Sequence, residues 1–175
     1  MLVMGGALLM GAAKKAPRFD TDGALIQPKG YRTWIFVGAP ITPNSLNPPA
    51  APFPEFHNVY MHPEDYAHYQ QTGTFRDGTI LIKELVSVGA TQAASGNGFF
   101  QGEYVGLEAA VKDSKRFSNE PGYWAYCTFS HESPPYPTTA MQQPVGACNA
   151  CHQANAAQDW VFTQYYPVLR AAKPK

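Results

Sequence analysis

Two cysteines and a histidine form the most chemically specific pattern in the chain, Cys148-Asn149-Ala150-Cys151-His152. The C-x-x-C-H spacing is typical of covalent c-type haem attachment. Each thiol adds to one haem vinyl group, and the two intervening residues let a single helical turn reach both vinyl groups. The adjacent His152 is then placed to act as the proximal axial ligand of the iron. The pattern therefore predicts one haem c, bound covalently through Cys148 and Cys151.

Two other interpretations of these cysteines compete with haem. Cys127, Cys148, Cys151 and His152 have the composition of a Cys3His zinc site. However, Cys151 and His152 are neighbours, and their side chains diverge too far to share one tetrahedral ion. A thioredoxin-like C-x-x-C is expected near a βαβ pattern, and none precedes this one. A haem site leaves Cys127 single in the apolar run 123–129, where we expect a buried, inert thiol.

The composition limits the class of protein. The 175 residues suit one domain, which we place at residues 14–175. Lysine and arginine together equal aspartate and glutamate at 13 each, so nothing favours nucleic acid or an anionic membrane as a partner. Three cysteines are too few for a disulfide framework. Sixteen prolines and 15 glycines indicate many turns and short strands.

The N-terminal residues 1–13 form a continuous apolar stretch of signal-peptide length. It is well short of the roughly 20 residues of a membrane-spanning helix, so we expect no membrane span. Gly11 and Ala13 are small residues before a possible cleavage at Lys14, although a positively charged n-region is missing. Because c-type haem is attached outside the cytoplasm, we expect an exported, periplasmic protein. The alternative is a disordered apolar tail.

Runs rich in aromatic and β-branched residues predict a sheet that must position the motif. We expect strands at residues 31–37, 56–61, 79–88, 99–111 and 122–129. Pro63, followed by Glu64 and Asp65, predicts a helix that ends at Gly73. The prolines of residues 39–54 indicate a long loop, and residues 95–98 a flexible one. Residues 159–171 have helical spacing, which Pro167 should interrupt. The fold class is therefore α+β, a mostly antiparallel sheet with flanking helices and a C-terminal haem-attachment helix.

The sixth coordination position of the iron is expected to be open. No His or Met occurs after His152, where a small electron-transfer cytochrome usually has its second axial ligand. A distal ligand would have to come from upstream, and no setting singles out one of Met61, Met141, His57, His62, His68 and His131. An open position favours substrate or gas binding over pure electron transfer.

Two charged residues stand where the strand pattern makes charge costly. Lys83 shares a strand face with Leu81 and Leu85, and is either a lysine that reaches the sheet edge or an amine desolvated beside the haem. Glu108 is the single charge of residues 105–111, on the face of Tyr104 by alternation. It is either a strand-end carboxylate at the water boundary or a group that exchanges protons beside an open haem site.

Long stretches of the chain resemble the cytochrome P-460 family of periplasmic c-type haem proteins. The likeness runs from about residue 31 to 173. It is carried by YRTW (31–34), FRDGTILIKELVSVG (75–89), SGNGFFQGEYVGLEAAVKDSKRF (95–117), CNACH (148–152) and VFTQYYPVLRAAK (161–173). The resemblance implies a mostly antiparallel sheet with flanking helices and a homodimer.

The resemblance also implies an activity, the oxidation of hydroxylamine to nitrous oxide through a haem nitrosyl, with electrons leaving to a redox partner. In the family, a lysine of the D-G-T-x-x-x-K-E-L segment makes a third covalent bond to the haem, and this position is Lys83. A carboxylate of the G-L-E segment transfers protons, and this position is Glu108. The runner-up is a gas-binding cytochrome of the c-prime-beta type, which binds nitric oxide without catalysis and for which Phe99 and Phe100 could form an apolar cap.

Overall fold

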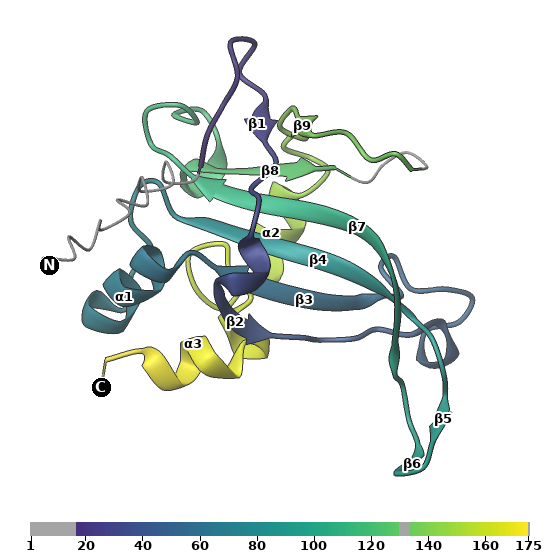
Figure 1. Ribbon diagram of the computed structural model, residues 1–175. Coiled ribbons are helices and arrows are strands. Elements are labelled where there is room, and N and C mark those ends of the chain that lie inside the picture. Colours follow the sequence, from purple (N-terminus) through teal and green to yellow (C-terminus); the bar gives the residue numbers. More distant parts are fainter. Residues whose placement is uncertain (1–16, 130–133, 175) are drawn as a thin grey trace, which may run out of the picture.

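A five-stranded antiparallel sheet in the order β2-β3-β4-β7-β8 forms the centre of the fold (Figure 1). The computed structural model describes residues 17–129 and 134–174, so the expected export signal at residues 1–13 lies outside the described residues. The strands are β2 (Ile35–Gly38), β3 (Phe56–Met61), β4 (Ile80–Val88), β7 (Gln101–Lys112) and β8 (Trp124–Thr128). This sheet and its flanking helices confirm the predicted α+β class.

Short helices and two small ladders complete the described part of the chain. The α-helices are α1 (Pro63–Thr72), α2 (Asn149–Asn155) and α3 (Pro167–Ala172), and the 3-10 helices are η1 (Tyr31–Thr33), η2 (Asn44–Leu46), η3 (Pro121–Tyr123) and η4 (Thr163–Tyr165). β1 (Leu25–Ile26) pairs with β9 (Thr139–Ala140), and β5 (Gln92–Ala93) pairs with β6 (Gly96–Asn97). None of the described helices has the length and apolar character needed to cross a membrane.

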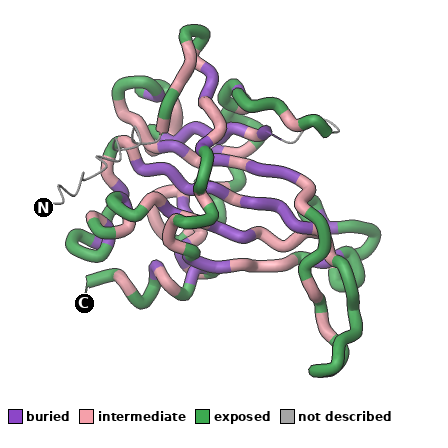
Figure 2. Tube along the Cα trace, in the orientation of Figure 1, coloured by how far each residue is buried: buried purple, intermediate pink, exposed green. Residues whose placement is uncertain are grey.

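Both faces of the sheet are buried. Successive side chains of each strand point to opposite sides, and each side packs against other elements. One face packs Ile80, Ile82 and Leu107 against the N-terminal stretch and β9. The other packs Leu81, Trp124, Tyr126 and other residues against α1, α3 and the segment after α2. In Figure 1 the purple N-terminal stretch passes in front of the sheet and α2 lies behind it. Figure 2 shows buried backbone running along the central strands.

Helix α1 forms where its end signals predict it. Pro63 is its first residue, Glu64 and Asp65 lie in its first turn, and Gly73 ends it with a left-handed φ of 69°. Proline lacks the N–H that a first turn cannot bond, and acidic side chains favour the positive end of the helix dipole. Glycine adopts positive φ without a Cβ clash.

Four of the expected elements differ from the sequence prediction. Residues 31–33 form the 3-10 helix η1, and the strand begins only at Ile35. Gly122 and Tyr123 have positive φ, so β8 begins at Trp124. Residues 95–98 contribute to the β5–β6 hairpin. The helix expected at 159–171 is wrong before Pro167, since Asp159 and Trp160 are left-handed and Pro167 is the first residue of α3.

Candidate haem site

The C-x-x-C-H motif lies at the start of α2, against β8. Cys148 is the N-terminal cap of the helix, and Cys151 and His152 follow within its first turns. Cys148 is half-buried, Cys151 is exposed, and both are free thiols. The amide of buried Asn149 donates a hydrogen bond to the carbonyl of Trp124 at 2.8 Å, which fixes the helix against the first residue of β8. The motif therefore presents two thiols one helical turn apart.

His152 is held with one nitrogen engaged and the other available. Its Nδ1–H donates to the carbonyl of Trp160 at 2.8 Å, and because a carbonyl only accepts, Nε2 carries the lone pair. The ring packs between Tyr126 and Phe162, with centroid distances of 4.2 and 4.6 Å. Burial lowers the pKa of His152, which keeps the imidazole neutral. A neutral ring oriented by a carbonyl is the usual state of a metal-ligating histidine.

Lys83 and Glu108 lie on the same face of the sheet as the motif. They are direct partners across the β4–β7 ladder, and Nζ of Lys83 lies 2.5 Å from Oε2 of Glu108. Both side chains are mostly buried, at 25% and 23% exposure. Their charges act in opposite directions on the pKa values of His152 and Cys148, so the pair and the motif share one electrostatic environment.

The structure places Lys83 away from a sheet edge and Glu108 away from a strand end. β4 is the third of five strands, so Lys83 does not reach a sheet edge. Glu108 lies within β7 rather than at its end. Gly106 and Ala110 flank Glu108 on this face, so its neighbours along β7 are small residues. The functional roles of Lys83 and Glu108 remain predictions, but the sheet brings them together.

A β-bulge in β7 changes which residues lie on the same face as Glu108. In the β4–β7 ladder Leu85 pairs with Gly106, but Val86 pairs with Tyr104, so β7 has one additional residue here. The bulge turns Tyr104 to the opposite face, where it packs against the core around Ile82 and Leu107. Simple alternation, which placed Tyr104 beside Glu108, was therefore wrong.

His57 is an upstream candidate that the described structure places in this environment. It pairs with Leu85 on β3, so it lies on the same sheet face as Lys83. Burial, and then the charge of Lys83, lower its pKa to about 4. Its Nε2 is buried and has no hydrogen-bond partner. Alternation along 56–61 gives the face of His57, but nothing in the sequence ranks it above the other candidates.

Met61 lies on the same sheet face as His57, but it is fully buried in the core cluster against which Cys148 packs. Met141 is exposed, and the His62 ring packs on Trp34 at 5.0 Å. His68 lies on α1, and His131 is outside the described residues.

Glu84 is a buried carboxylate that the sequence left without a partner. It accepts hydrogen bonds from the hydroxyl of Tyr31 and from Nε of Arg32, each at 2.7 Å, and from Asn58. Alternation puts Glu84 on the face opposite Lys83. Its charge is therefore satisfied by a structural cluster on that face.

The residues present fit a haem c. Two free thiols one turn apart match the covalent attachment, and His152 has its Nε2 free and its Nδ1 anchored. A shared zinc site does not fit, because Cys127 belongs to the core on the opposite face of the sheet. Among residues 17–129 and 134–174, no cluster of three or more Cys, His, Asp and Glu side chains is arranged to hold a metal ion.

Comparison with known proteins agrees with this donor set. The model of the family described as Cytochrome P460 matches residues 28–163, most of the chain. The matched region contains the C-x-x-C-H motif together with Lys83 and Glu108. No curated protein matches the chain. The family match implies a haem c cofactor.

Proposed function

Because the chain belongs to the cytochrome P460 family and is a haem c cytochrome, we propose that it oxidises hydroxylamine to nitrous oxide in the periplasm. The observation that carries this proposal is the Lys83–Glu108 pair, which lies on the sheet face of the haem-attachment motif. A cytochrome that only transfers electrons has no need of a partly buried carboxylate there. Anaerobic turnover of hydroxylamine, with analysis of the gas formed, tests the proposal.

The reaction requires a proton acceptor and an electron acceptor. Two hydroxylamine molecules yield one nitrous oxide, one water, four protons and four electrons. Glu108 accepts protons as substrate is oxidised, and its partly exposed side chain can pass them to solvent. The electrons leave to a redox partner, since the product retains none of them.

Cys148, Cys151 and His152 would hold the haem c, which would supply a redox-active iron to which a small ligand can bind. The chain holds and tunes this group. The carbonyl of Trp160 fixes the tautomer of His152, and the rings of Tyr126 and Phe162 exclude water from its sides. As long as Nζ of Lys83 remains a free amine, its ion pair orients the carboxylate of Glu108.

Lys83 is also the residue that we propose to form a third covalent link, from Nζ to a carbon of the macrocycle. This bond replaces one N–H and one C–H, so its formation needs a two-electron oxidant such as a peroxide. The position of Lys83, mostly buried and on the face of the motif, supports the proposal. Once linked, Lys83 would hold the macrocycle against β4.

The second candidate function is gas binding without turnover. Phe53 favours it, since its ring lies 4.3 Å from Nζ of Lys83 and offers an apolar surface on this face. Phe99 and Phe100 lie at some distance from Glu108 along the chain. They precede β7 at Gln101, seven residues from Glu108, or roughly 23 Å along an extended strand. We further propose that the protein is a homodimer, as the family resemblance implies.

A further inference from the structure

A tight turn after α2 presents the carbonyl that orients His152. Gln158 and Val161 form an isolated antiparallel bridge, and the backbone N–H of Val161 donates to the carbonyl of Gln158 at 2.8 Å. The two central residues, Asp159 and Trp160, have φ values of 46° and 58°. Left-handed φ at both positions is the geometry of a type I′ turn, which glycine and asparagine favour. Trp160 is an unfavourable residue for it, so surrounding contacts must hold the turn.

This turn places the carbonyl of Trp160 where it can accept hydrogen bonds from two side chains. It accepts the Nδ1–H of His152 at 2.8 Å and the hydroxyl of Tyr126 at 3.2 Å. The Trp160 ring packs over Gly122, where a Cβ would lie 2.4 Å from the indole. A bulkier residue at 122 would therefore displace the indole. The position of the Trp160 carbonyl depends on this packing.

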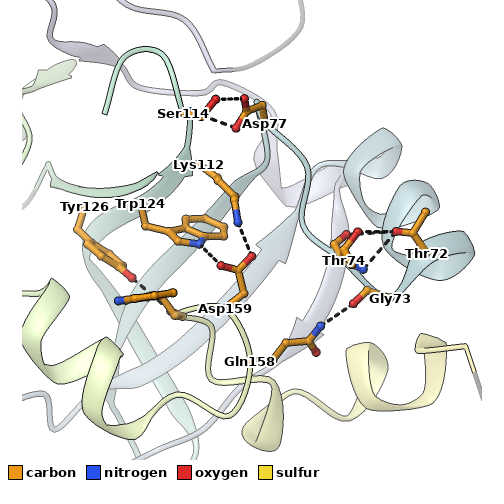
Figure 3. A network of polar contacts seen from close by, with 11 residues as sticks. Thr72, Gly73, Thr74, Asp77, Lys112, Ser114, Trp124, Tyr126, Gln158 and Asp159 are labelled. Carbon is orange, nitrogen blue, oxygen red and sulfur yellow. Dashed lines mark hydrogen bonds and ion pairs between the residues drawn. The ribbon is translucent and has the colours of Figure 1, made fainter. Parts of the chain in front are cut away.

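Asp159 ties the turn to the sheet (Figure 3). Its Oδ2 lies 2.5 Å from Nζ of Lys112, and its Oδ1 accepts the indole N–H of Trp124 at 3.3 Å. Lys112 and Trp124 are themselves partners across the β7–β8 ladder. The ion pair is largely shielded, with Lys112 at 15% and Asp159 at 25% exposure. Because the carbonyl of Trp124 also holds Asn149, one cross-strand pair anchors both the haem motif and the turn.

Gln158 adds a second anchor, on the side of α1. Its amide donates to the carbonyl of Gly73 at 2.5 Å and its oxygen accepts the hydroxyl of Tyr69 at 2.9 Å. The turn is therefore fixed from two directions, and Asp159 supplies the only one of these anchors that carries a charge.

We propose that Lys112 and Asp159 are positioning residues that hold the carbonyl of Trp160 against His152 and so set the reduction potential of the haem. A well-aligned hydrogen bond from Nδ1–H increases the electron donation of an imidazole to its metal, which favours the oxidised iron. Loosening the carbonyl weakens this donation and raises the potential. The inference rests on His152 as the axial ligand, but it does not depend on the substrate.

Two substitutions separate positioning from a simple effect of charge. Lys112→Met removes a positive charge, and on electrostatic grounds alone it would lower the reduction potential. Asp159→Asn removes a negative charge and would raise it, while asparagine tolerates the left-handed backbone. If the pair acts through the carbonyl of Trp160, both substitutions release the turn, and both raise the potential. The double variant should then show about the same rise as either single variant, because each breaks the same interaction.

The measurement is spectroelectrochemistry of the haem-loaded variants, with the iron–histidine stretching band recorded by resonance Raman. The expected result is a higher potential and a lower stretching frequency in both single variants. Arg32→Gln is the matched control, because it breaks a partly buried ion pair with Glu84 on the opposite face. It should lower the thermal midpoint and leave potential and band unchanged.

Opposite shifts of potential in the two single variants, or shifts no larger than that of Arg32→Gln, would overturn the inference. A wrong assignment of His152 as the axial ligand would give a different result. The wild-type protein itself would then show no iron–histidine band.

Discussion

Nζ of Lys83 and Oε2 of Glu108 lie 2.5 Å apart on adjacent strands, on the sheet face against which Cys148 packs. The ladder register makes this contact, since residues directly opposite in an antiparallel pair are close enough for their side chains to interact. The arrangement joins an amine and a carboxylate at one place on the sheet.

Glu108→Gln should slow hydroxylamine oxidation by about a hundredfold, the lower end of what a positioned proton acceptor contributes. The amide keeps the size of the side chain but cannot take a proton. Haem content should stay at the wild-type level, because the thiols and His152 are unchanged. Steady-state turnover and the haem absorbance per protein check both statements.

Glu103→Gln is the control for this prediction, because Glu103 lies on the same strand but is exposed. It should retain wild-type turnover. Equal activity in Glu108→Gln and the wild type would remove Glu108 from the mechanism.

The third covalent link predicts a specific peptide map. After proteolysis of the haem-loaded protein, the peptide containing Lys83 should remain joined through haem to the peptide containing Cys148 and Cys151. Lys83→Arg should release it, because a guanidinium is a poor nucleophile at neutral pH. Two separate peptides from the wild type, found by mass spectrometry, would refute the link.

Thiol counting tests the attachment chemistry. Haem thioethers should consume Cys148 and Cys151, which leaves Cys127 as the single thiol of the chain. Burial raises the pKa of Cys127 to about 12, so it should not react with a thiol reagent in the folded protein. One thiol should appear on unfolding in denaturant. Three reactive thiols in the denatured, haem-loaded protein would rule out covalent attachment.

His57 should make the protein less stable in mild acid. Its pKa is about 4 in the folded chain against 6.5 for an ordinary histidine, so the unfolded state binds more protons between these values. The contribution of neutral His57 to the free energy of unfolding is fully present above about pH 6.5, and it is lost as the pH falls towards 4. Allowing for partial exposure, the loss is on the order of 2 kcal/mol.

Denaturant unfolding of the wild type and His57→Gln at a series of pH values measures this contribution. The difference in unfolding free energy between the two proteins should narrow as the pH falls from neutral to about 4. A difference that is constant over this range would show that His57 does not titrate in the way described.

The strands and the helix with strong local signals were predictable from the sequence. Residues 56–61 form β3 as predicted, and Pro63 and Gly73 mark the ends of α1. Alternation along β4 gave the neighbours of Lys83 correctly, since Leu81 and Leu85 share its face and Glu84 lies opposite. The c-type haem motif needs no structure to be recognised, since its chemistry is contained in five consecutive residues.

The remaining features depend on contacts between distant residues. The bulge beside Val86 reverses Tyr104, and no local signal marks it. Helical spacing at 159–166 was misleading, because the apolar residues there pack around His152 from a turn held by Lys112 rather than from a helix. His57 could be ranked only once β3 and β4 were paired.

Anaerobic incubation of the haem-loaded protein with hydroxylamine and an excess of an artificial electron acceptor tests the central claim most directly. The account predicts nitrous oxide, detected by gas chromatography, at one molecule for every two hydroxylamines consumed and four electrons delivered to the acceptor. Binding of nitric oxide without any consumption of hydroxylamine would contradict it, and would identify the protein as a gas-binding cytochrome.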